Sequence, residues 1–119
     1  MRWKPDKDRP ICPQICEYIC VSIASGVFLA EQKLPSVREL ALEIGVNPNT
    51  VQRSYEILEQ QDIIYTERNL GRYVGKDTSI AKKKVEELAR LKTMDYLQGM
   101  SLLGFNEEAV KNYIKEWNV

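Results

Sequence analysis

The side chains best suited to chemistry in this sequence are the amides, hydroxyls and guanidinium groups that cluster between residues 36 and 53. Asparagine and glutamine amides pair with adenine edges, and arginine pairs with guanine or with a phosphate. The 119 residues include no histidine, no glycine-rich phosphate loop and no serine or cysteine beside a recognisable base. The sequence therefore favours nucleic-acid binding over catalysis, and we expect no enzyme activity, no metal and no cofactor.

Two short predicted helices would position this cluster. Ser36 followed by Glu39 forms a capping box, so the first helix should begin just after Ser36. Gly45 ends it, because glycine adopts the left-handed conformation without strain. Asn47 then supplies an N-cap and Pro48 takes the first helical position, where its missing N–H costs nothing. A second helix therefore opens almost at once.

The second helix is predicted to have one apolar face. Val51, Tyr55 and Leu58 recur at spacings of four and three residues, which places them together against a core. The side chains left on the outer face are Asn49, Gln52, Arg53 and Glu56. Two short helices joined by a tight glycine-containing turn are typical of a helix-turn-helix, which can read DNA or can serve packing alone. We interpret the outer face as the one that reads DNA.

Three blocks of sequence, in this order, resemble a known family. They are residues 34–41 (LPSVRELA), residues 46–51 (VNPNTV) and residues 71–74 (GRYV). Their order and spacing are similar to those of the winged-helix domain in the GntR family of bacterial transcription regulators, and the resemblance covers about residues 8 to 76. It implies a mainly α-helical fold with a small β-wing. The winged helix-turn-helix DNA-binding domain would occupy residues 1–76, with an N-terminal arm at 1–9.

The wing is predicted as a hairpin of two strands. It comprises a strand at 62–66, a turn at 67–70 and a returning strand at 71–75. Gly71 would let the backbone approach a partner closely, and Arg68 and Arg72 on either side are placed for phosphates or the minor groove. The family often has a glycine where Asn69 stands, and asparagine tolerates the same left-handed conformation. The alternative is a solvated hairpin that only closes the core.

The resemblance also implies a set of DNA contacts. Arg38 matches an arginine that commonly holds DNA, and Asn49 and Thr50 match polar contact positions. Pro48 and Gln52 stand where the fatty-acid-responsive branch has arginines, so the base-reading code must differ from that of this branch. Together with the wing, the predicted DNA-binding residues are Ser36, Arg38, Asn47, Asn49, Thr50, Gln52, Arg53, Arg68, Gly71 and Arg72.

A first helix is predicted from residue 10 to about residue 26, after an arm in which Trp3 should tuck against the nearest apolar surface. Its apolar stripe comprises Ile11, Ile15, Ile19 and Ile23. One position further round lie Cys12, Cys16 and Cys20. The outer two of these cysteines would be about 12 Å apart along the axis, too far to share a metal ion. We interpret the three as small apolar residues beside the core, with redox sensing as the alternative.

Residues 77–119 are predicted to form a helical dimerisation tail. A helix is expected from 80 to about 98, interrupted only at Gly99, and Asn106 should cap a last helix. Apolar residues in the first of these recur every three positions, so the stripe winds around the axis and needs a second subunit to cover it. The predicted dimerisation residues are Val85, Leu88, Leu91, Met94, Leu97, Val110, Tyr113, Ile114 and Trp117.

Composition and charge set the broad class. The chain has 44% apolar residues, and no apolar run approaches the ~20 residues of a membrane span, so we expect no membrane partner and a cytoplasmic protein. The 17 basic and 17 acidic residues give zero net charge. A DNA-binding protein of this kind needs a basic face rather than a basic average, so its acidic residues must lie elsewhere. Those to be checked are Glu17, Glu31, Glu43 and Glu59.

The NPNTV block at 47–51, followed by Arg53 and Tyr55, is similar to the YtrA-type branch of the family, which implies transporter genes as targets. We expect a homodimeric repressor that places two recognition helices in successive major grooves, about 34 Å apart, of a pseudo-palindromic operator in double-stranded DNA. A small-molecule effector of unknown identity at the tail-to-tail junction is left open. The competing hypothesis is a winged-helix protein-interaction adaptor that has lost DNA binding.

Overall fold

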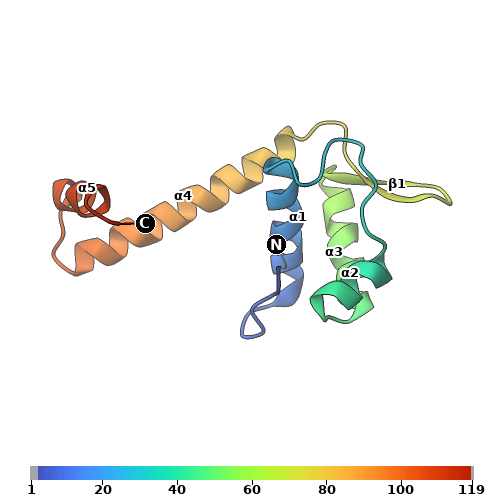
Figure 1. Cartoon of the computed structure of the whole chain (residues 1–119), viewed down its shortest axis with the longest axis horizontal. Coiled ribbons are helices and arrows are strands. Elements are labelled where there is room, and N and C mark those ends of the chain that lie inside the picture. Colours follow the sequence, from blue (N-terminus) through green and yellow to red (C-terminus); the bar gives the residue numbers. More distant parts are fainter. Residues whose placement is uncertain (1–2, 119) are drawn as a thin grey trace. The chain divides into compact units, whose positions relative to one another are not determined.

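A computed structural model describes residues 3–118, in two compact units, one ending at Val85 and the other beginning at Glu86. The elements in chain order are α1 (Ile11–Ala24), α2 (Val37–Ile44), α3 (Pro48–Gln60), β1 (Ile64–Glu67), β2 (Gly71–Val74), α4 (Ser79–Leu102) and α5 (Glu107–Lys115) (Figure 1). A mainly helical chain with a two-stranded wing after α3 confirms the predicted fold class. Among the described residues, no helix is both long enough and apolar enough to cross a bilayer.

The caps of α2 and α3 are those predicted from the sequence. The Ser36 hydroxyl accepts the Glu39 N–H at 3.1 Å, and the Glu39 carboxylate accepts the Ser36 N–H at 3.0 Å. These hydrogen bonds hold the pKa of the Glu39 carboxyl below its usual value. Gly45 closes α2 with φ +73°, and the Asn47 side chain accepts the Asn49 N–H at 2.8 Å to open α3. The short connection between the two helices is therefore fixed by local hydrogen bonds.

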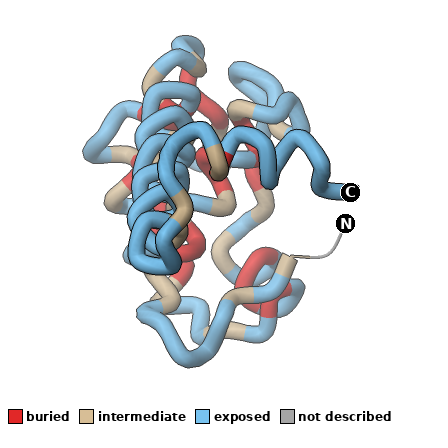
Figure 2. The backbone as a smooth tube through the Cα atoms, turned by 90° about the vertical axis from the view of Figure 1, so that its left-hand side faces the viewer, coloured by how far each residue is buried: buried red, intermediate tan, exposed pale blue. Residues whose placement is uncertain are grey.

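Helix α3 is the centre of the first unit, because it packs against α1, α2 and β1. Its predicted apolar face is confirmed, since the side chains of Val51, Tyr55 and Leu58 are fully buried. Figure 2 shows the buried residues of the chain as red stretches of the backbone between exposed ones. Ile15 and Ile19 of α1 are equally buried against it. This core holds α3 from one side and leaves its other side at the surface.

The three cysteines of α1 lie at and beside this core. Cys20 is buried, while Cys12 and Cys16 are half-buried against α3. The hydroxyl of the buried Ser54 donates to the Thr50 carbonyl at 2.8 Å and lies 3.2 Å from the Cys12 sulfur, and the Cys16 thiol donates to the Ser54 carbonyl at 3.6 Å. Burial raises the pKa of the Cys16 thiol to about 12, so this thiol stays protonated at neutral pH. These contacts agree with cysteines that serve packing.

The wing is a hairpin whose first strand is displaced from the predicted one. β1 and β2 pair antiparallel, with Ile64 opposite Val74 and Glu67 opposite Gly71. The strand was expected to begin at Asp62, but this residue adopts φ +60° in the turn that follows α3, and the strand begins at Ile64. The predicted left-handed conformation of Asn69 in the hairpin turn is confirmed, with φ +67°.

The loop before α2 ends in an extended segment that pairs with β2. The Leu34 N–H donates to the Arg72 carbonyl at 2.8 Å, and the Val74 N–H donates to the Gln32 carbonyl at 2.9 Å. Glu31, in the same segment, takes φ +65° and donates its N–H to the Val74 carbonyl at 3.0 Å. The wing is therefore bonded through its backbone to the residues that lead into α2.

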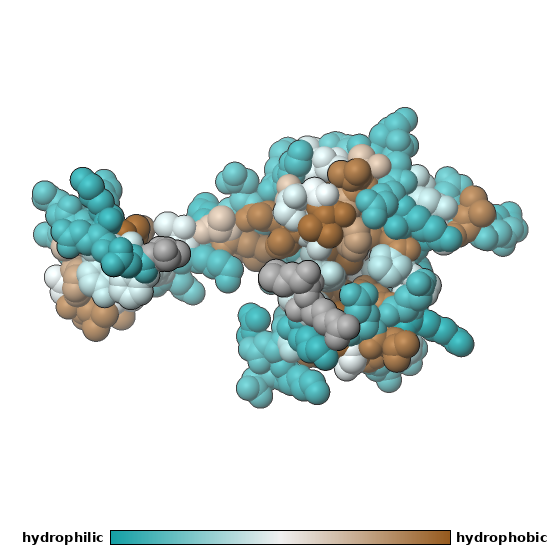
Figure 3. All heavy atoms as spheres, in the orientation of Figure 1, coloured by the Kyte–Doolittle hydropathy of each residue, from teal (hydrophilic) through white to brown (hydrophobic). Residues whose placement is uncertain are grey.

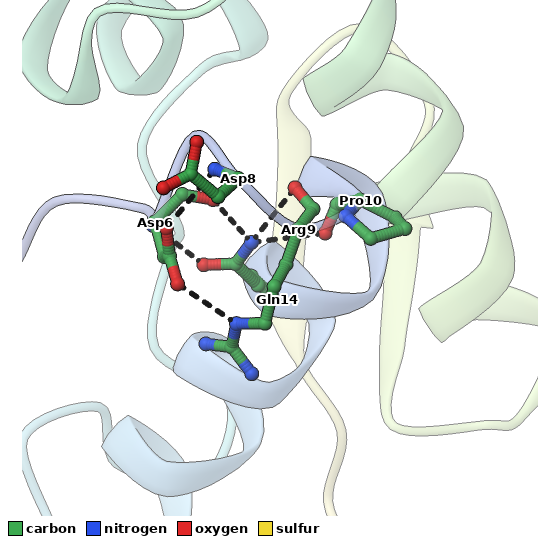
Figure 4. A network of polar contacts seen from close by, with 5 residues as sticks. All are labelled: Asp6, Asp8, Arg9, Pro10 and Gln14. Carbon is green, nitrogen blue, oxygen red and sulfur yellow. Dashed lines mark hydrogen bonds and ion pairs between the residues drawn. The ribbon is translucent and has the colours of Figure 1, made fainter.

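The N-terminal arm folds onto α1. Trp3 stacks on Tyr18 with ring centroids 4.6 Å apart, which confirms that it tucks against the protein. The Gln14 side chain accepts the Asp6 N–H at 2.7 Å and donates to the carbonyls of Asp6 and Pro10 at 2.8 and 3.0 Å (Figure 4). A single buried amide thus organises the turn that leads into α1.

Helix α4 is longer than predicted at both ends. It continues through Gly99 to Leu102, because one glycine costs a helix only about 1 kcal/mol and does not have to end it. The stop is Gly104, with φ +91°, where the Phe105 N–H donates to the Met100 carbonyl at 3.0 Å. At the other end Ala81 is buried in the core of the first unit, so this unit extends past the predicted boundary at residue 76.

The second unit consists of the rest of α4 and helix α5. The Asn106 side chain accepts the Ala109 N–H at 2.8 Å, as expected for the predicted cap, and Val110 is buried. The Phe105 ring meets the Tyr113 ring edge-on at 5.6 Å. Hydrophobic side chains nevertheless reach the surface of this unit (Figure 3). The large exposed ones are Leu91, Met94, Tyr96, Leu97, Leu102, Leu103, Tyr113, Ile114 and Trp117.

Substituting Gly71→Ala should destabilise the wing. The φ of +120° at Gly71 is one that side-chain-bearing residues rarely adopt, and a Cβ there would lie 3.2 Å from the Lys33 Cε. We expect a loss on the order of 1–2 kcal/mol in the free energy of unfolding, measured by urea denaturation. Asn69→Gly is the matched control, since Asn69 already tolerates its left-handed φ, and its stability should change little. Equal stability of Gly71→Ala and the wild type would contradict the conclusion that the backbone at this position requires glycine.

Candidate nucleic-acid interface

Three exposed arginines mark the candidate interface, one on each element that was predicted to contact DNA. Arg38 lies on α2, Arg53 on α3 and Arg68 in the hairpin turn between β1 and β2. Within residues 3–118, none of them has a carboxylate within 4.0 Å. Helix α2 packs against α3, and the hairpin follows the C-terminal end of α3 (Figure 1). The structure thus supplies positive charges that the protein's own acids do not neutralise.

The front of α3 presents amides and a hydroxyl close to Arg53. Asn49 is exposed, while Thr50 and Gln52 are half-buried. The Gln52 amide donates to the Glu56 carboxylate, one turn later, at 2.8 Å. Glu56 therefore orients the amide that could read a base, and a carboxylate at this position could itself accept a hydrogen bond from cytosine. The sequence placed Glu56 on this face but gave no sign of the hydrogen bond.

Ser36 and Asn47 lie at the N-termini of α2 and α3, where backbone N–H groups point outward. Each side chain already accepts a hydrogen bond in capping its helix. The Ser36 hydroxyl and the Asn47 amide can still donate, since a hydroxyl and an amide are donors as well as acceptors. Donors at a helix N-terminus suit a phosphate group. These two residues combine a structural role with a potential contact.

Lys33 is a cation that sequence reasoning missed. It pairs with Tyr73 across the sheet, and its Cε would lie only 3.2 Å from a Cβ on Gly71. The amino group therefore lies beside the hairpin turn that carries Arg68. The sequence shows only that a lysine directly precedes the Leu34–Pro35 block. Its position beside the hairpin turn depends on the pairing of this segment with the wing, which the sequence does not show.

Arg72 differs from the other predicted contact residues because its guanidinium already has partners within the protein. Its Nε donates to the Glu59 carboxylate at 2.6 Å, and its Cζ lies 5.3 Å from the centre of the Tyr55 ring. Only 20% of the Arg72 side chain is exposed. The sequence placed it beside Gly71 but could not show which face of the hairpin it occupies. The structure directs it toward α3.

Acidic side chains were required to lie away from the interface. Glu59 is neutralised by Arg72, and Glu17 lines a cavity of about 330 Å³ beside Trp3. Glu31 opposes Val74, at the end of β2 remote from the hairpin turn, and Glu43 is exposed in α2. Glu17 meets the condition by its position beside Trp3, whereas Glu59 stays near the wing with its charge neutralised by Arg72.

The predicted dimerisation residues do not form one surface. Val85 packs against the core of the first unit, and Val110 is buried within the second. Leu88 is half-buried. The members of the set that are exposed are Leu91, Met94, Leu97, Tyr113, Ile114 and Trp117. Tyr113, Ile114 and Trp117 line a cavity of about 310 Å³ together with Tyr96.

Comparison with known proteins identifies the family of this chain and several of its relatives. The model of the family described as "Bacterial regulatory proteins, gntR family" matches residues 13–74. The HTH-type transcriptional repressor YtrA of Bacillus subtilis is 35% identical, over 94% of this chain and 87% of its own length. The uncharacterised HTH-type transcriptional regulator YhcF of the same organism is 34% identical, over 90% of this chain and 88% of its own length.

Solved structures extend the likeness to the whole chain and to a complex with DNA. A GntR family transcriptional regulator from Listeria monocytogenes has a TM-score of 0.85 and 38% identity, over 96% of this chain and all of that one. The AraR DNA-binding domain in complex with operator ORE1 has a TM-score of 0.54 and 30% identity, over 56% of this chain and 82% of that one. The chain belongs to the GntR family of DNA-binding, non-enzymatic bacterial transcription regulators.

Proposed function

We propose that this regulator is a homodimeric repressor that binds a pseudo-palindromic operator through α2, the front of α3 and the wing. The observation that carries the proposal is the set of exposed arginines, Arg38, Arg53 and Arg68, one on each of these elements and each without a carboxylate nearby in residues 3–118. Likeness to the repressor YtrA and to an operator-bound DNA-binding domain supports it.

In this proposal α3 enters the major groove with its N-terminal end toward the bases. Asn49, Gln52 and Arg53 read base edges, because amides suit adenine and arginine suits guanine. Arg38 and Thr50, with the capping residues Ser36 and Asn47, bind phosphates on either side of the groove. Arg68, Lys33 and the backbone at Gly71 reach phosphates or the minor groove from the wing.

A chain with zero net charge can bind DNA in this way, because the interaction depends on the local field. Association with DNA gains from the release of counterions by each cation that reaches a phosphate. Arg38, Arg53, Arg68 and Lys33 supply such cations. We expect affinity to fall as salt rises, with a slope of log affinity against log salt of about 0.9 for each phosphate that these cations contact.

Dimerisation is assigned to the second unit on the basis of its exposed apolar side chains. Leu91, Met94 and Leu97 on α4 and Ile114 and Trp117 on α5 would otherwise stay in water. A second copy can cover them and carry a second recognition helix to the next major groove, about 34 Å away. The resemblance to the YtrA-type branch noted in the sequence implies transporter genes as targets, and the tail junction is where a small-molecule effector could act.

DNase footprinting on the region upstream of the chain's own gene tests the proposal. The expected result is a protected site with two related half-sites, seen with the full chain at low salt. A folded dimer that protects no site there or elsewhere in the neighbouring genome would refute the operator-binding proposal and favour a protein-interaction adaptor.

The double substitution Arg38→Ala and Arg53→Ala should abolish specific binding. Each base-reading arginine contributes about 1–3 kcal/mol, so losing Arg53 alone should weaken operator binding by roughly 5- to 150-fold. Arg90→Ala is the matched control, because this exposed arginine pairs with Glu87 in the second unit. Retention of operator affinity by the double variant, measured by gel shift, would contradict the proposed contacts.

Substituting Ile114→Lys should weaken the dimer without unfolding the first unit. Ile114 is 55% exposed within the chain, so a lysine is tolerated in the monomer but not under a second subunit. We expect the dissociation constant of the dimer to rise by about tenfold or more in sedimentation equilibrium. Leu42→Lys, on the exposed Leu42 of α2, is the control and should leave the dimer intact. An unchanged dimer in Ile114→Lys would place the interface elsewhere.

A further inference from the structure

The guanidinium of Arg72 contacts two side chains of α3 at once. Its Nε donates to the Glu59 carboxylate at 2.6 Å, a short charge-assisted hydrogen bond, with 20% and 30% of the two side chains exposed. Its Cζ lies 5.3 Å from the centre of the Tyr55 ring, within the range of a cation–π interaction. Partial burial strengthens both interactions, since they are screened less than at an open surface. The side chain thus ties β2 to α3.

The same residue is connected to the chain that leads into α2. The Tyr55 hydroxyl donates to the Pro35 carbonyl at 2.8 Å, and Pro35 directly precedes the N-cap of α2. The Arg72 carbonyl accepts the Leu34 N–H at 2.8 Å. One arginine therefore joins the wing, α3 and the start of α2 through its side chain and its backbone.

We propose that Arg72 is a positioning residue for operator binding and does not itself contact DNA. It holds the wing at a fixed angle to α3, so that Arg68 and the backbone at Gly71 meet the duplex that α3 reads. Arg72 needs its ion pair with Glu59 to do this, so Glu59 is part of the same positioning contact. The consequence for DNA rests on the operator binding proposed above, whereas the connection of the wing to α3 does not.

The substitution Glu59→Gln separates positioning from contact, because the two roles predict opposite signs. If Arg72 served a phosphate, removing Glu59 would release its guanidinium and remove a negative charge, and binding would stay the same or strengthen. If Arg72 positions the wing, Glu59→Gln should weaken binding to the footprinted duplex by roughly three- to tenfold. Glu17→Gln is a control for charge, since Glu17 is an exposed acid of α1 beside Trp3, outside the proposed interface, and its binding should match the wild type.

The salt dependence of binding gives a second, independent readout. Arg68→Gln, which removes a proposed phosphate contact, should lower the slope of log affinity against log salt by about 0.9. Arg72→Gln should weaken binding about as much as Glu59→Gln, and the double variant should be no worse than either single one. When Arg68→Gln is already present, adding Arg72→Gln should leave the slope unchanged, because Arg72 acts through the wing contact that is already lost. A further drop of about 0.9 in the slope of that double variant, or a Glu59→Gln variant that binds as well as the wild type, would overturn the proposal.

Amide hydrogen exchange tests the connection without DNA. In both Arg72→Gln and Glu59→Gln, the Leu34 and Val74 amides, which bond the wing to the segment before α2, should exchange faster. Amides of α3 around Val51 should keep their protection if the fold is intact. Unchanged exchange at Leu34 and Val74 in both variants would refute the positioning role, whereas absence of a footprint with the wild type would refute only the proposed operator binding.

Discussion

The orientation of α3 depends on Tyr55, a fully buried tyrosine whose hydroxyl donates to the Pro35 carbonyl at 2.8 Å. A buried hydroxyl without a partner would cost about 1–3 kcal/mol, so this bond fixes both the rotation of α3 and the position of the chain that enters α2. Burial raises the pKa of the Tyr55 phenol, which keeps the donor proton in place. Arg72 lies over the same ring and brings the wing to the same point. The three elements that carry the candidate interface therefore share one anchor.

Much of the fold could be predicted because its signals are local. The capping box of Ser36 and Glu39, the left-handed Gly45 and the Asn47 cap act within a few residues, and the structure has them as predicted. The end of α4 could not be read in this way, because Gly99 is tolerated in a helix and the Schellman-type hydrogen bonds around Gly104 decide the stop.

The candidate site was predictable where exposure follows from helical spacing and not where it depends on pairing between distant segments. Arg53 follows from the outer face of its helix, and Arg38 follows from the resemblance to the family. The roles of Lys33 and Arg72 do not, because Lys33 reaches the wing only through its pairing with Tyr73, and Arg72 turns to Glu59 on another element. A strand of four residues alternates its faces, so adjacency along the chain cannot show which arginine reaches solvent. Arg68 and Arg72 are therefore close together in the hairpin, yet Arg68 is exposed to solvent and Arg72 is bound to α3.

A structure of the dimer bound to the duplex that it protects would show directly whether α3 and the wing bind DNA together. We expect α3 of each protomer in successive major grooves, with Arg38 and Arg68 on phosphates and the Arg72 guanidinium still paired with Glu59. A complex in which α3 lies outside the groove, or in which Arg72 has left Glu59 for a phosphate, would contradict this expectation.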